Sequence, residues 1–170
     1  MTVEQGTRNS EQGFRQLLAW RRADDLAADT YRLSEVVKQR HRWLADQIAR
    51  AAFSVTNNIA EGYGRSSPPD YLRFVEIACG SLNEVENALH FISRNQILAP
   101  AELRQAEVLR QATGNLLFGL ARSLRKKLSD GGVWQRGLVR DEAASYRLES
   151  EFEPPTPEFP VPGSKFPGEV

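Results

Sequence analysis

The chain has 170 residues, a length that fits one domain with an appended tail. Its 22 basic and 22 acidic residues cancel, but residues 14–128 carry a net charge of +5 and residues 129–170 a net charge of −4, so contact with nucleic acid is permitted but not required. The single cysteine, Cys79, excludes an internal disulfide and favours the cytoplasm, and no apolar stretch suggests secretion or a membrane span.

Residues 1–13 are polar and predicted to be flexible. A first helix is expected from Phe14 or Gln16 to about Lys38. Its apolar stripe is Leu17, Trp20, Leu26, Ala27, Tyr31, Leu33 and Val37. A polar break follows, and a second helix is expected from Arg42. Its apolar residues recur every three or four positions, at Leu44, Ile48, Ala51, Val55 and Ile59.

The segment from Gly62 to Asp70 predicts one helix end, a tight turn and one helix start. We expect Gly62 and Gly64 to take the positive φ angles that end a helix. Ser67 is predicted to cap the third helix, with Pro68 at its first position and Asp70 as the acidic partner of the cap.

The third helix has the most regular pattern, with a seam of Val75, Ala78, Leu82, Val85, Leu89 and Ile92. Tyr71, Phe74 and Ile77 lie outside this seam, which indicates a second contact surface. Gly80 lies in mid-helix, where glycine costs about 1 kcal/mol relative to alanine. We therefore expect another backbone to approach closely at Gly80, with Ser81 beside it.

Residues 95–99 are predicted to form a short loop before a fourth helix that Pro100 opens. Its stripe comprises Leu103, Ala106, Arg110, Thr113, Leu117, Leu120 and Leu124. Four helices joined by short links, with no alternation typical of strands, predict an all-α protein: an antiparallel up-down-up-down four-helix bundle over residues 14–128.

The composition changes after residue 128. Residues 129–170 are acidic and contain six of the nine prolines, so they are predicted to be a largely disordered tail. Phe152, Phe159 and Phe166 recur seven residues apart in it. The tail is either a partner-binding segment or an untethered end.

The residues offer no recognisable catalytic or cofactor chemistry. The two histidines, His41 and His90, lie in no metal-binding spacing, and no phosphate-binding glycine loop occurs. Cys79 is expected to be a packed, inert thiol. We therefore predict that the protein is not an enzyme and holds no cofactor or metal.

Cations at the predicted helix ends are candidates for phosphate binding. They are Arg21, Arg22, Arg40, Arg42, Arg122, Arg125, Lys126 and Lys127. Compensation of the helix dipole is the alternative explanation for the last three of these.

Two segments resemble a known protein family. They are residues 58–65, Asn-Ile-Ala-Glu-Gly-Tyr-Gly-Arg, and residues 74–84, Phe-Val-Glu-Ile-Ala-Cys-Gly-Ser-Leu-Asn-Glu. Residues 14–128 closely resemble the bacterial four-helix-bundle family of proteins encoded in intervening sequences of large-subunit ribosomal RNA genes. One departure is the link between the first two helices, where the family usually carries a Phe-Pro turn.

The resemblance implies a bundle that assembles into a ring-like homopentamer. It also implies kinship with the accessory proteins of retroelements, which bind nucleic acid and a reverse transcriptase. The family-like positions are Asn58, Glu61, Gly62, Gly64, Arg65, Gly80, Ser81 and Glu84. Their roles are either to fix the hairpin and subunit contacts or to bind a ligand, and Arg65 joins the candidate cations.

Two hypotheses follow. The first is a non-enzymatic oligomeric bundle that binds nucleic acid, RNA in preference to DNA, as an accessory or scaffold protein. The second is a protein-interaction scaffold that recruits a protein through a bundle face or the Phe-Pro tail, without nucleic acid.

Overall fold

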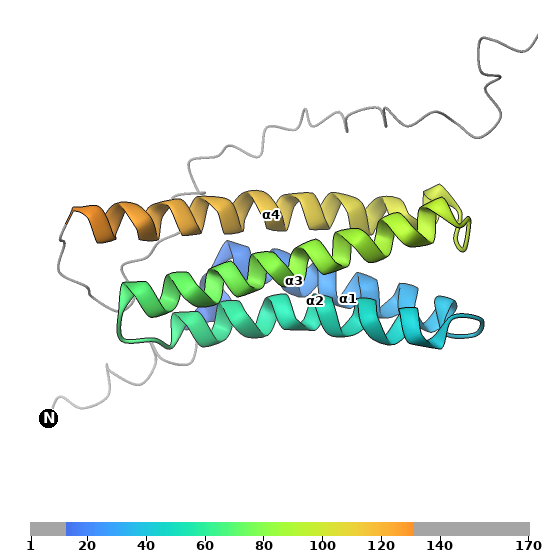
Figure 1. The fold of residues 1–170 in the computed structure, drawn as a ribbon, viewed down its shortest axis with the longest axis horizontal. Coiled ribbons are helices and arrows are strands. Elements are labelled where there is room, and N and C mark those ends of the chain that lie inside the picture. The colour runs from blue at the N-terminus through green and yellow to red at the C-terminus, as the bar shows by residue number, and fades with distance from the viewer. Residues whose placement is uncertain (1–12, 131–170) are drawn as a thin grey trace, which may run out of the picture.

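The structure, a computed structural model, describes residues 13–130, and Figure 1 shows them as a bundle of four helices. A short 3-10 helix, η1 (Phe14–Gln16), precedes α1 (Leu18–Val37), α2 (Arg42–Tyr63), α3 (Pro68–Arg94) and α4 (Pro100–Ser129). The predictions of a flexible N-terminus and of a disordered tail fall almost wholly outside the described residues. The predicted all-α four-helix architecture is confirmed within them.

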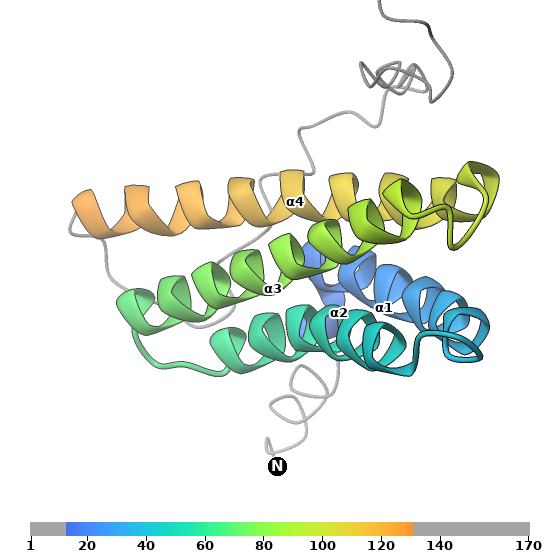
Figure 2. The ribbon, with the colours of Figure 1, turned by 45° about the vertical axis from the view of Figure 1, so that its right-hand side comes forward.

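The helices pack in a closed square, with α2 and α4 each lying between α1 and α3. Neighbouring helices run in opposite directions. Gln47 bonds to Glu84 and Ser54 to Ser81, so residue numbers rise along α2 as they fall along α3. The turned view in Figure 2 shows the same order and shows that α4 extends beyond the α2–α3 turn.

The core contains most of the four predicted stripes, but Trp20 and Ala27 are only half-buried, and Arg110 pairs with Glu86 instead of joining the core. Every residue of the α3 seam is at most 5% exposed, and the α2 stripe is equally buried. The predicted burial of Tyr31 is wrong, because its side chain is 60% exposed on the outside of α1. The spacing in α1 assigned Tyr31 to the core, but the ring lies at the edge of the α1–α2 contact.

The α2–α3 turn is stabilised at the start of α3 as predicted. The Asp70 backbone N–H donates to Ser67 Oγ at 3.3 Å, and the Ser67 hydroxyl donates to the Asp70 carboxylate at 2.7 Å. The expectation for the glycines is wrong. α2 continues through Gly62 to Tyr63, and Gly64 ends it with φ −72°, so neither glycine uses a positive φ angle.

Gly62 is required for packing. A Cβ atom there would lie 2.6 Å from Tyr71 Cδ2 and 2.9 Å from Phe74 Cβ, distances that no side chain can occupy without displacing α3.

Among the non-glycine residues of the described chain, Gln96 has a positive φ angle, 53°, and lies in the link between α3 and α4.

The link between α1 and α2 closes without a Phe-Pro turn. The backbone N–H groups of Arg40 and His41 both donate to the Val37 carbonyl, and the His41 carbonyl accepts the first bonds of α2. Within residues 13–130, no helix combines the length and the hydrophobicity that crossing a membrane requires.

Candidate nucleic-acid interface

Polar side chains link α2 to α3 beside the family motif. Ser54 Oγ on α2 lies 2.8 Å from Ser81 Oγ on α3, and Asn58 Nδ2 donates to the Ser54 carbonyl at 2.8 Å within α2. Nearer the start of α2, Gln47 Nε2 donates to the Glu84 carboxylate on α3 at 3.1 Å. Ser81 and Glu84 are used in joining α2 to α3, and Asn58 bonds to Ser54, the α2 residue that contacts Ser81. These contacts favour the structural role that the sequence left open.

Within residues 13–130, no backbone approaches Gly80 closely, because a Cβ atom built there meets nothing within 4 Å. The backbone expected at Gly80 is therefore not a neighbouring helix of the described bundle, and a backbone of another copy stays a prediction. The close contact occurs one residue later, where Ser81 is buried against α2.

The candidate cations divide between the two ends of the bundle. One group lies in the half that contains the α2–α3 turn, on the first turns of α1, in the turn itself and on the last turns of α4. Its members are Arg21, Arg22, Arg65, Arg122, Arg125, Lys126 and Lys127. The other group, Arg40 and Arg42, lies at the α1–α2 link. The 20 residues of α1 separate the groups by on the order of 30 Å.

Several cations near the α2–α3 turn already have a polar contact. Arg22 pairs with Asp25 at 3.0 Å, Arg125 with Glu76 at 2.9 Å, and Arg65 with Glu61. Arg21 Nε donates to the Arg15 carbonyl at 2.8 Å. All four contacts lie at the surface, where ion pairs contribute at most about 1 kcal/mol, so a phosphate can compete for these groups.

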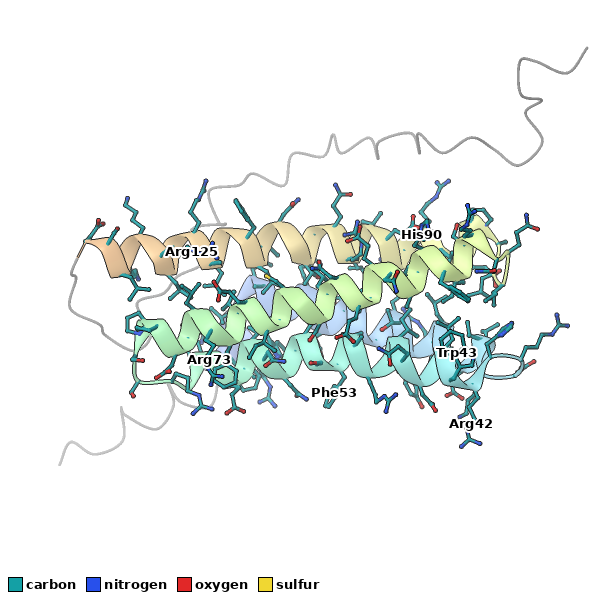
Figure 3. All side chains as sticks on the ribbon, in the orientation of Figure 1. Arg42, Trp43, Phe53, Arg73, His90 and Arg125 are labelled. Atoms are coloured by element: carbon teal, nitrogen blue, oxygen red, sulfur yellow. The ribbon has the colours of Figure 1, made fainter. Side chains whose placement is uncertain are left out.

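Three candidates are better placed for an incoming anion. Arg40, Arg42 and Lys126 are exposed, and residues 13–130 supply none of their side chains with a hydrogen bond or an ion pair. Arg42 points away from the bundle at the start of α2 (Figure 3).

An arginine that the sequence did not single out lies beside Arg65. The guanidinium carbons of Arg65 and Arg73 lie 4.5 and 4.7 Å from the centre of the Phe74 ring. Cations within about 6 Å of an aromatic ring are attracted to its face. The two arginines are therefore held close together at the start of α3, next to the turn.

Two exposed aromatic residues were also absent from the predicted set. Trp43 and Phe91 are 61% and 40% exposed, and each stands one position before a core residue, Leu44 and Ile92. That offset is the signal available in the sequence: a large aromatic ring beside the apolar stripe but not in it.

A comparison with protein families shows the family to which the chain belongs. The family model described as 23S rRNA-intervening sequence protein matches residues 15–119. The chain belongs to this family. The resemblance that the α2–α3 motif carries is thereby confirmed, and the matched region includes all of α1, α2 and α3 and most of α4.

One solved structure of related fold is a protein of unknown function from the S23 ribosomal protein family of Bacteroides thetaiotaomicron VPI-5482. It superposes with a TM-score of 0.59 at 19% identity, covering 62% of this chain and 99% of that one. At this identity the likeness shows the fold alone. A comparison with curated proteins finds no match.

This intervening-sequence family member has its free cysteine, Cys79, on α3. No three His, Cys, Asp or Glu side chains within residues 13–130 are grouped to hold a metal ion. Burial raises the pKa of the half-buried Cys79 thiol, and Glu76 adds to this effect while Arg125 opposes it. A raised pKa reduces the thiolate fraction at neutral pH, so Cys79 is a poor nucleophile.

Proposed function

We propose that the protein is a non-enzymatic accessory or scaffold protein of the cytoplasm, which assembles with copies of itself and binds nucleic acid, RNA in preference to DNA. The observation that carries the proposal is the gathering of cations at both ends of the bundle. Arg40, Arg42 and Lys126 among them have no polar partner within the described residues. Neutralising phosphates with such side chains releases counterions and gives salt-sensitive binding.

Charge reversal at these cations tests the proposal. Lys126→Glu and Arg42→Glu are each expected to weaken RNA binding by roughly tenfold. Each should also make the slope of log affinity against log salt concentration shallower by about 1, the loss of one phosphate contact. Both side chains are exposed, so the fold should not change. Arg125 is a poorer choice because its reversal would also place a carboxylate against Glu76. The measurement is fluorescence anisotropy of a labelled RNA pool across a salt series.

Arg50→Glu is the matched control, because Arg50 is exposed in the middle of α2, away from both groups. It should leave RNA affinity within about twofold of the wild type. Equal losses in all three variants would mean that only net charge matters. Unchanged binding in Lys126→Glu and Arg42→Glu would refute a role for these cations.

Self-assembly is the second part of the proposal, and Gly80 supports it. Glycine in mid-helix costs about 1 kcal/mol, yet nothing in the described chain lies within 4 Å of a Cβ atom at this exposed position. A backbone of another copy packed against α3 would account for it. Ile77, one turn earlier on α3, is 41% exposed and adds apolar surface. The family resemblance gives a homopentamer as the form of the assembly.

Gly80→Ala is expected to weaken this assembly and to lower the mass measured by light scattering at low concentration. Gly119→Ala is the control for the change in helix propensity, because Gly119 lies on α4, outside the proposed α3 contact, and its Cβ position is equally free within residues 13–130. It should leave the mass unchanged. A Gly80→Ala protein that keeps its mass and gains about 1 kcal/mol of stability would contradict a subunit contact at α3.

A protein-binding scaffold is the second candidate function, and a groove between α1 and α2 supports it. Ala27, Tyr31, Ala49, Arg50 and Phe53 line a cavity of about 370 Å³, and Phe53 is 62% exposed. Figure 3 shows Phe53 pointing outward from α2. An assembly whose mass does not change with RNA at any salt concentration would favour this function. The Phe-Pro tail lies outside the described residues.

A further inference from the structure

The α1–α2 end of the bundle presents a pair of exposed aromatic rings. The ring centres of Trp43 and Phe91 lie 5.7 Å apart with their planes at 74°, an edge-to-face contact that joins the start of α2 to the end of α3. The rings are 61% and 40% exposed. Figure 3 places Trp43 at the start of α2, near the link to α1.

The other two aromatic pairs of residues 13–130 are less exposed to solvent. The Phe14–Trp20 and Tyr63–Tyr71 rings are half-buried or buried. Leaving a tryptophan more than half exposed forgoes the favourable free energy of burying its large apolar surface. An edge-to-face contact occupies one face of one ring, so other ring faces are free to stack a planar group.

Three arginines lie close to this pair along the chain. Arg42 directly precedes Trp43, Arg94 lies one helical turn after Phe91 on the same side of α3, and Arg40 is in the adjoining link. Each of the three side chains is exposed and has no hydrogen bond or ion pair to residues 13–130. Asp46, one turn after Trp43, is the carboxylate nearest to it along α2. The three arginines outnumber this carboxylate, so this set of four residues has a net positive charge.

Exposed aromatic rings beside unpaired cations are the combination that binds single strands. Bases stack on the rings and phosphates contact the cations, and this stacking tolerates any base. A duplex keeps its bases stacked inside, so it would engage only the cations. A protein partner would use the rings but would gain little from three arginines without matching carboxylates.

We propose that Trp43 and Phe91 form a stacking platform for an unpaired base of a single-stranded RNA, with Arg40, Arg42 and Arg94 contacting the adjacent phosphates. This inference rests on the proposed nucleic-acid function and names its ligand: a single strand rather than a duplex. The cations at the opposite end of the bundle contact phosphates without an exposed aromatic pair of this kind in the described residues.

The test compares an oligouridylate of about 12 nucleotides with a duplex RNA of the same length, using the full-length protein. Trp43→Ala is expected to weaken oligouridylate binding by roughly tenfold while leaving its salt dependence unchanged, because a stacking contact and no phosphate contact is lost. Duplex binding should stay within about twofold. Trp43→Phe should restore most of the affinity, since phenylalanine also stacks.

Phe53→Ala is the matched control, because Phe53 is as exposed as Trp43 but lies in the α1–α2 groove. It should bind oligouridylate like the wild type. Unchanged oligouridylate binding by Trp43→Ala would overturn the platform. So would a fall in its light-scattering mass without RNA, which would assign the aromatic pair to a contact between copies.

The two proposals fail in different ways. A wild-type protein that binds neither RNA in a salt-sensitive manner would overturn the proposed function, and the platform with it. A wild-type protein that binds RNA and loses affinity on Arg42→Glu but not on Trp43→Ala would overturn the platform alone.

Discussion

Replacing Gly62 with alanine is expected to lower the free energy of unfolding by about 3 kcal/mol, at the upper end of the usual cost of an overpacked core. The added Cβ would lie 2.6 Å from Tyr71 Cδ2 and 2.9 Å from Phe74 Cβ. Tyr71 is 1% exposed and has no room to withdraw, and the Phe74 Cβ is fixed to the α3 backbone. α2 and α3 must therefore separate near their turn.

Denaturant unfolding followed by circular dichroism measures this effect, at one fixed protein concentration because assembly makes stability concentration-dependent. Gly119→Ala controls for helix propensity. Apart from its own helical turn, the described part of the chain has no atom within 4 Å of the Gly119 Cβ position, so this variant should gain up to about 1 kcal/mol of stability. A Gly62→Ala protein as stable as the wild type would contradict the packing described for the turn.

Gly62→Ala also tests whether the family motif serves packing of the hairpin or contact with RNA. Gly62 belongs to the family motif, and its contacts place it inside the α2–α3 hairpin. We expect Gly62→Ala to bind RNA with wild-type affinity at temperatures where it remains folded. Lost RNA binding in a folded Gly62→Ala protein would instead assign the motif a direct part in the ligand contact.

The sequence predicted the core well because burial in a bundle follows helical periodicity. Residues spaced three and four apart share a face, and in α3 that face meets both neighbouring helices, so Val75 to Ile92 are buried without exception along the seam. The cap of α3 was also predictable. Ser67 and Asp70 interact within four residues, and no tertiary contact is needed to bring them together.

The sequence could not show contacts between elements. Tyr31 fits the α1 stripe, but whether it is covered depends on the width of the α1–α2 contact. Gly62 was recognised as a residue of the turn for the wrong reason, because a missing side chain can serve either a positive φ angle or a close neighbour. Only the position of the Tyr71 ring decides between them.

The candidate interface was predictable in part. Cations near helix ends were found by their positions in the chain, yet the sequence did not separate Arg40 and Arg42 from the cations at the far end of the bundle. Arg73 was missed because it becomes part of a cluster only when Phe74 and Arg65 meet across the turn. The contact of Trp43 with Phe91 likewise joins residues that are far apart in the sequence.

Tyr71→Ala is expected to lower the free energy of unfolding by about 4 kcal/mol, within the range for removing a large buried ring. Tyr71 is 1% exposed, fills the space above Gly62 and meets Tyr63 edge to face at 6.5 Å. Its loss leaves a cavity at the turn that Gly62, having no side chain, cannot fill. Unfolding in denaturant at the concentration used for Gly62→Ala gives the comparison.

The double variant Gly62→Ala/Tyr71→Ala tests whether the two residues share one contact. Removing the ring eliminates the closest clash of the new Cβ, but the contact with Phe74 Cβ at 2.9 Å remains. The two losses should therefore fall short of additivity by at least about 1 kcal/mol, since residues in contact couple by that order. Additive losses would mean that the Tyr71 ring does not pack on Gly62. The hairpin motif would then need a different explanation, such as a contact with another copy.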